Sequence, residues 1–289
     1  CIQVMLHLIS LYAAQCGKKP VVLAGRNAHK AFVNACALLD IGIEWLYPND
    51  EQSYIACNIT AQQISERLAG QNGRITAVYI TSPDYLGNMQ DIAAIARACH
   101  ESGALLSVDN AHGAYLKFMP TPAHPMDLGA DICCDSAHKT LGVITGGAYL
   151  HISVSAPAVL AERAKASFSV FGTSSPSYLI LQSLDAANGT MEAFRNELHA
   201  FLPAADLLKA KLAAHGFELA GSEALKLTLK PKSFGYSGQD IAATLEAANI
   251  YPEFYDPDYI VLMLSPRHSE RELDALCDTL CSLPRRAPI

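Results

Sequence analysis

Cysteine pairs with metal-binding or redox spacing are absent from this sequence of 289 residues. None of its nine cysteines forms a C-x-x-C pair, and most lie in apolar segments, where cysteine behaves as a small hydrophobic residue. We interpret them as the reduced thiols of a cytoplasmic protein, and their spacing predicts no metal site.

Blocks of basic residues are also absent. Lysine and arginine number 21 against 28 acidic residues, a formal charge of -7, which argues against nucleic acid as a partner. The stretch 140–161 has no charged residue, but it contains His151, Pro157 and two adjacent glycines. We therefore expect a strand and the start of a helix there, and no membrane-spanning segment.

Apolar residues, by contrast, are abundant. A hydrophobic content of 51% with 17% charged residues predicts a globular protein with a sizeable core, large enough for one major domain and a smaller one. The sequence opens at Cys1 on an apolar helical pattern without the basic region of a signal peptide, so we expect an N-terminal part to be missing.

Strand-like runs alternate with helical patterns over the first two thirds of the chain. After the opening helical pattern, three further helices are predicted: one that ends at Gly42, one with Thr60 as its N-cap and one closed by Gly103. The strands between them are apolar on both faces. This pattern predicts an α/β domain of three layers, with a mostly parallel sheet covered by helices on both sides.

Polar residues follow three of these strands directly, at 81–84, 109–112 and 136–139. Ligands of parallel sheets bind beyond the carboxyl ends of the strands, so these three segments are expected to meet in one crevice. From residue 196 the pattern changes to a small α+β domain, whose last helix has Ser269 as N-cap and Glu272 completing a capping box. The predicted domains are 1–195 and 196–289.

Lys139 and Asp109 are the residues with the clearest chemical potential. A lysine amine attacks carbonyl groups when it is partly desolvated, and Lys139 follows an apolar strand in a nearly uncharged neighbourhood. Asp109 ends another apolar strand, where a carboxylate is costly to bury unless it meets a cation. Taken alone, each has a simpler interpretation: an exposed lysine and a turn-capping aspartate.

Five motifs together resemble the major domain of the Orn/Lys/Arg decarboxylase family: GRNAHKAFVNACALLDI, YITSPDYLGNMQDIAAI, VDNAHGAYLKF, GADICCDSAHKTLGVITGGAYLH and FGTSSPSYLILQSLDAA. The resemblance covers about residues 1–195. It implies the aspartate aminotransferase fold (fold type I), pyridoxal 5'-phosphate (PLP) as cofactor, and decarboxylation of lysine, arginine or ornithine.

The resemblance also implies roles for single residues. Lys139 would form the Schiff base with PLP, Asp109 would pair with the pyridine nitrogen, and His29 would stack on the ring, with Ala111 against its other face. Ser136 and His138 would support the phosphate. Residues Thr173 and Ser174 would reach the phosphate of a neighbouring subunit, which implies a homodimer with shared sites. The family's phosphate-binding loop would lie before Cys1.

Simpler interpretations of these residues stay open. His29 and the segment 173–176 could serve only as helix starts. His112 is expected among the cofactor-binding residues, as a supporting or core histidine rather than a catalytic one. Transamination, aldol cleavage or cysteine desulfuration by another fold type I enzyme is a competing hypothesis, because Arg267 resembles in position the arginine that binds the substrate carboxylate in aminotransferases; it could also be a solvated arginine before the last helix. A non-catalytic PLP-fold protein is a third hypothesis. No residue is assigned to the substrate's basic side chain, for which the candidates are Asp84, Glu253, Asp256 and Asp258.

Overall fold

The computed structural model describes residues 1–48, 53–71, 73–173 and 175–289. These residues divide into two compact units: unit 1 comprises Cys1–Asp84 and Gln90–Thr190, and unit 2 comprises Tyr85–Met89 and Met191–Ile289. The change of unit after Thr190 and the boundary expected at 195/196 both fall within the long helix α7 (Tyr178–His215).

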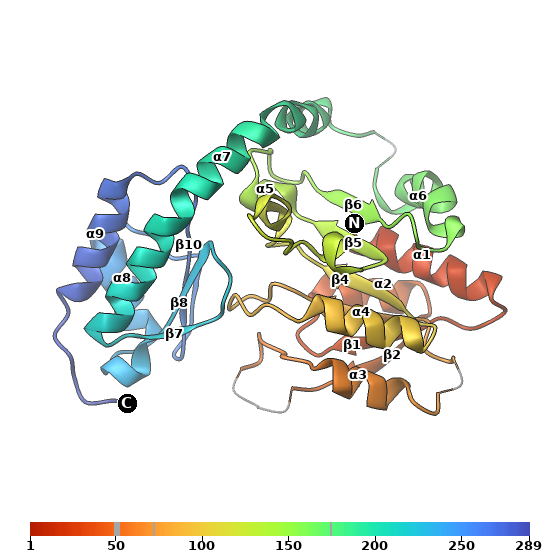
Figure 1. Cartoon of the computed structure of the whole chain (residues 1–289), viewed down its shortest axis with the longest axis horizontal. Helices are drawn as coiled ribbons and strands as arrows, with labels where there is room; N and C mark the ends of the chain where they lie inside the picture. Colours follow the sequence, from red (N-terminus) through yellow and green to blue (C-terminus); the bar gives the residue numbers. More distant parts are fainter. Residues whose placement is uncertain (49–52, 72, 174) are drawn as a thin grey trace. The chain divides into compact units, whose positions relative to one another are not determined.

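Unit 1 is built on a six-stranded sheet (Figure 1). Its strands have the order β2-β1-β3-β4-β5-β6 and the bounds β1 (Val21–Gly25), β2 (Gly42–Leu46), β3 (Ala77–Thr81), β4 (Leu105–Asp109), β5 (Ile132–Asp135) and β6 (Tyr149–Ile152). The first five in this order are parallel, and β6 runs antiparallel to β5. The mostly parallel sheet is therefore confirmed.

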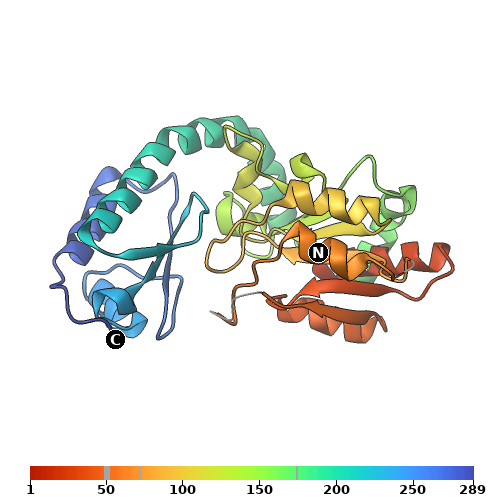
Figure 2. The same ribbon diagram turned by 60° about the horizontal axis from the view of Figure 1, so that its bottom comes forward.

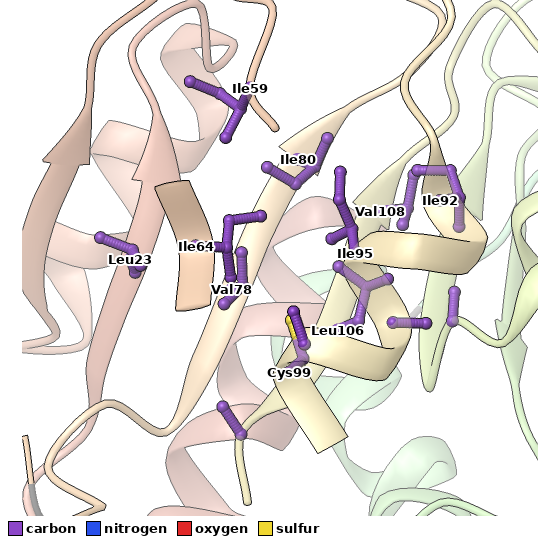
Figure 3. Packing of buried hydrophobic residues seen from close by; sticks show 14 of the residues in the cluster. Leu23, Ile59, Ile64, Val78, Ile80, Ile92, Ile95, Cys99, Leu106 and Val108 are labelled. Carbon is purple, nitrogen blue, oxygen red and sulfur yellow. The ribbon is translucent and has the colours of Figure 1, made fainter. Parts of the chain in front are cut away.

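Helices cover both faces of this sheet. Successive side chains of a strand point to opposite faces, so alternate residues of one strand pack against different helices. Val78 and Ile80 of β3 pack with α3 (Ala61–Leu68) and α4 (Ile92–Glu101), as Figure 3 shows. The alternate residues Ala77 and Tyr79 pack on the other face, with α1 (Ile2–Gln15), α2 (Lys30–Leu38) and α6 (Ala158–Phe171). The predicted three layers are confirmed.

Helix ends follow the predicted signals at two of three positions. Thr60 caps α3 in a capping box with Gln63, and Gly103 follows α4 with a positive φ of 71°. The prediction for Gly42 is wrong, since α2 already ends at Leu38 and Gly42 is the first residue of β2. Asp40, with a φ of 53°, makes the left-handed turn after α2.

Unit 2 contains an antiparallel sheet, drawn in cyan and blue in Figure 2. The order of its strands is β7-β8-β10-β9. Its elements are β7 (Glu218–Ala220), β8 (Lys226–Lys230), β9 (Phe254–Tyr255), β10 (Ile260–Met263), α8 (Gly238–Ala247), α9 (Glu270–Cys281) and the last part of α7. The capping box of Ser269 and Glu272 at the start of α9 is confirmed.

The uncharged stretch 140–161 contains β6 and the beginning of α6, as predicted. Among the described residues, no helix is both long and apolar enough to cross a membrane. All nine cysteines have free thiols.

Candidate active site

A pocket of about 280 Å³ opens at the carboxyl ends of β4 and β5. The register places Thr81, the last residue of β3, beside Asp109, the last of β4, and Asp109 beside Cys134 of β5. The expected convergence is observed in part: the segments 109–112 and 136–139 contribute Asp109, Ala111 and Ser136 to the pocket, whereas 81–84 only adjoins it through the pairing of Thr81 with Asp109. The first turn of α1 lines the same pocket, and the backbone N–H groups of a helix start suit an anionic group.

Asp109 lines this pocket and is only 2% exposed. The Tyr79 hydroxyl donates to its Oδ2 at 2.9 Å, and the Ala111 N–H donates to its Oδ1 at 3.2 Å. Burial raises the pKa of Asp109, and these two hydrogen bonds, with His29 and Lys139 nearby, offset only part of that rise. The site thus contains a buried carboxylate whose negative charge is incompletely compensated.

Lys139 lies on the short helix α5 (Ala137–Thr140), which directly follows β5. Its Nζ is 2.8 Å from Nε2 of the buried His112, a contact that the sequence did not reveal. An ammonium group only donates, so the lone pair of His112 Nε2 faces Lys139 while the lysine is charged. Lys139 is exposed in this structure, against the expectation of a partly desolvated amine.

His29 and Ala111 line the pocket together with Asp109. His29 is the N-cap of α2, and its Nδ1 accepts the Ala31 N–H at 3.1 Å. The capping bond leaves the other edge of the imidazole ring available while it fixes the ring at the pocket wall. His29 therefore acts as a helix cap and is also available to a ligand.

Ser136 lines the pocket at the N-cap position of α5, where its hydroxyl makes no capping bond. The His138 side chain bonds the Gly147 carbonyl oxygen through Nδ1 at 2.9 Å. Because a carbonyl only accepts, Nδ1 carries a proton, and Nε2 is a donor only if the ring is protonated. Thr173 is exposed and accepts the Ser175 N–H, and Ser174 lies outside the described residues.

Asp135 also lines the pocket, and sequence reasoning missed it. It accepts hydrogen bonds from Asn110, His124 and His151. The sequence did contain a signal, since Asp135 ends an apolar strand in the same way as Asp109.

The candidates for binding the substrate have other partners or are buried. Asp84 is fully buried, and Glu253 accepts a hydrogen bond from the Tyr85 hydroxyl at 3.2 Å. Asp256 accepts two backbone N–H groups of its own turn, and Asp258 pairs with Lys232. The Arg267 side chain is 75% exposed and pairs with Glu197.

Solved structures share this fold. The lysine decarboxylase of Francisella novicida superposes with a TM-score of 0.77 at 17% identity, over 97% of this chain and 47% of that chain. Lysine decarboxylase A from Pseudomonas aeruginosa gives the same TM-score at 16% identity, over 97% and 47% of the two chains. The three-layer unit with its site at the strand ends is the fold of PLP-dependent enzymes of fold type I.

Residues 7–228 match the family model for the major domain of Orn/Lys/Arg decarboxylases, and the chain belongs to this family of PLP-dependent decarboxylases. It is 30% identical to the uncharacterized protein YaaO of Bacillus subtilis over 279 residues, 92% of this chain and 57% of that protein. It is 27% identical to an arginine decarboxylase of the same species, over 96% of this chain and 60% of that protein. The chain thus spans less than two thirds of the length of these relatives.

Proposed function

We propose that the protein carrying this chain decarboxylates lysine, arginine or ornithine, with PLP bound covalently to Lys139. The observation that carries the proposal is the buried Asp109 carboxylate that lines a pocket, on the strand next to the one that leads into the segment bearing Lys139. An anion with a raised pKa at such a position is stabilised by a cation, and the protonated ring nitrogen of PLP is one.

The residues present suit this cofactor. Ala111 adds little bulk beside Asp109, so a flat ring has room against the pocket wall, where His29 is fixed by its capping bond. The first turn of α1 and the Ser136 hydroxyl offer donors for a phosphate group. PLP, when bound, supplies an electron sink for the bond that breaks as carbon dioxide leaves.

The chain's own residues would perform three tasks. Asp109 would hold a proton at the ring nitrogen, and Tyr79 would hold Asp109 in its ionised form by donating to Oδ2. His112 would accept a proton from the Lys139 ammonium across their 2.8 Å contact, which prepares the amine as a nucleophile. Lys139 would deliver a proton to the substrate's α-carbon.

We also propose a homodimer in the cytoplasm. Large apolar side chains are exposed near the end of α6 and the start of α7, among them Val170 at 66%, Tyr178 at 84% and Leu179 at 67%. Exposed apolar side chains of this kind are typical of a protein interface, and in the sequence they stand on either side of the segment that would reach the partner's phosphate. The nine free thiols suit a reducing compartment.

The first test is carbon dioxide release from lysine, arginine and ornithine by the full-length protein with added PLP. One substrate is expected to react, and Lys139→Ala should reduce release to background, while Lys19→Ala, which changes an exposed lysine, should not. Borohydride reduction should attach the cofactor to the Lys139 peptide of the unmodified protein. A keto acid or an aldehyde in place of carbon dioxide would contradict the proposed reaction, and attachment at another lysine would contradict the role of Lys139.

A further inference from the structure

A single carboxylate, that of Asp135 at the end of β5, connects its own strand to three other segments of unit 1. Its Oδ2 lies 3.0 Å from Nε2 of His124 and 2.9 Å from Nε2 of His151. Its Oδ1 accepts the side-chain N–H of Asn110 at 2.7 Å. His124 precedes the short helix η2 (Pro125–Leu128), His151 is in β6, and Asn110 follows β4.

The protonation of these partners follows from their other contacts. His124 Nδ1 accepts the Met126 N–H at 3.3 Å, so the ring proton of a neutral His124 is on Nε2 and points to Asp135. His151 also faces the Asp135 carboxylate with its Nε2 atom. A proton on this nitrogen makes a hydrogen bond to the carboxylate, whereas a lone pair on it would repel the carboxylate oxygen. Two histidines and one aspartate can also hold a metal ion, and their ligand atoms lie within 4.8 Å of one another. The backbone bond to His124 Nδ1 favours the hydrogen-bonded network, because a metal at Nε2 would place a proton on Nδ1, opposite the Met126 N–H.

Asp135 and Asn110 each adjoin one of the two segments that form the candidate active site. Asn110 immediately follows Asp109 and begins the loop 110–113, which contains Ala111 and His112. Asp135 immediately precedes Ser136 and α5, which bears Lys139. Asn110 is fully buried, and Asp135 is 4% exposed, so water does not readily replace the bond between them.

We propose that Asp135 is a positioning residue, which fixes the loop 110–113 and helix α5 relative to each other and thereby sets the contact of His112 with Lys139. The importance of that contact rests on the proposed function. The clamp itself is independent of it. His124 and His151 hold the Asp135 carboxylate in one orientation, and Asn110 transmits this orientation to the loop.

Gly113 supports this arrangement. A Cβ atom at this position would overlap Asn110 Oδ1 and lie 2.7 Å from Cδ1 of Leu116. Its backbone N–H also donates to the Asn110 carbonyl oxygen at 2.8 Å. The loop is thus closed tightly around the Asn110 side chain, in the orientation that Asp135 requires.

Hydrogen exchange, followed by mass spectrometry on the full-length protein without cofactor, tests the clamp. In Asp135→Asn the amide cannot accept from all three donors, and exchange in peptides covering 110–118 and 137–144 is expected to accelerate by about tenfold or more. Asp131→Asn is the matched control. Asp131 comes just before the first residue of β5, and its carboxylate accepts hydrogen bonds from the His100 side chain and the Leu106 N–H. This variant should leave both peptides within about twofold of the unmodified protein.

His151 provides a second pair of variants in case Asp135→Asn does not fold. Its side chain is 37% exposed, so substitution is tolerated better there than at the buried His124. His151→Gln keeps a donor and should retain slow exchange, whereas His151→Leu should lose it. Unchanged exchange in both Asp135→Asn and His151→Leu would overturn the proposal.

Zinc titration distinguishes the network from a metal site. Stoichiometric binding of Zn²⁺ that Asp135→Asn abolishes would overturn the proposal, and absence of such binding supports it. If exchange changes as expected but Lys139→Ala retains decarboxylation, the proposed function fails while the clamp stands. If Lys139 proves essential but exchange is unchanged, only the clamp fails.

Discussion

Replacing Tyr79 by phenylalanine removes one hydroxyl group from the candidate active site. The Tyr79 side chain is fully buried, its ring centroid lies 4.2 Å from that of Phe32, and its hydroxyl donates to Asp109 at 2.9 Å. Phenylalanine keeps the ring and its packing. The change therefore isolates a buried hydrogen bond to a carboxylate.

The cost depends on the charge of Asp109. A hydrogen bond to a neutral acceptor contributes about 0.5–1.5 kcal/mol, and one to a charged acceptor about 1.5–3 kcal/mol. Loss of the Tyr79 hydroxyl raises the already elevated pKa of Asp109 further, because the hydroxyl favours the ionised carboxylate. The destabilisation is therefore expected to be largest above the pKa of Asp109 and to shrink as the pH falls through it.

Urea unfolding at about pH 8 and about pH 4 measures this difference. Trp45, the only tryptophan, lies in β2 and reports on unit 1 by fluorescence. Tyr149→Phe is the matched control in the same unit, because its hydroxyl donates to the neutral carbonyl of Leu184 at 3.2 Å. A loss of stability at Tyr79→Phe that is equal at both pH values, or no larger than that of the control at pH 8, would refute the reasoning.

Two further changes test the surroundings of the site. Gly113→Ala should destabilise unit 1 by about 1–3 kcal/mol through overpacking against Asn110, whereas Gly142→Ala, whose added methyl group meets no atom within 4 Å, should cost little by the same assay. The pKa of Asp135 lies below its usual value, so the carboxylate stabilises the fold above its unfolded pKa of about 3.9, and this contribution is lost as the pH falls towards the folded value. The stability gap between the unmodified protein and Asp135→Asn should therefore narrow from pH 7 to about pH 3, and a constant gap would contradict this account.

The sheet and its ligand edge were predictable from the sequence. Short strands that are apolar on both faces, such as β3 and β4, require cover on both sides and hence a parallel arrangement. Once the strands are parallel, their carboxyl ends lie at one edge of the sheet, so Asp109 is expected at the same edge as the segment after β5. Neither step requires knowledge of a side-chain contact.

The contact of Lys139 with His112 was not predictable in this way. It depends on the conformation of the loop 110–113 and of the four-residue helix α5, and neither has a hydrophobic period that would fix it. The end of α2 was misjudged for a similar reason, since an aspartate in the left-handed conformation is less common than a glycine there.

The partners of Asp135 come from more distant segments. His124 is 11 residues and His151 16 residues away, and His151 reaches the carboxylate because β6 runs antiparallel to β5. The sequence predicted a strand at this position but not its direction. The carboxylate at the end of β5 was visible in the sequence, whereas the arrangement of donors around it was not.

Asp109 and Asp135 show why these donors matter. Both carboxylates end neighbouring strands, both are buried, and both line one pocket. Burial raises the pKa of each, but at Asp135 the hydrogen bonds from His124 and His151 outweigh it and leave the pKa low. At Asp109, Tyr79 and one backbone N–H offset only part of the effect, and the pKa stays high. The carboxylate with saturated hydrogen bonding is suited to hold structure, and the one with incomplete hydrogen bonding is suited to bind a cation.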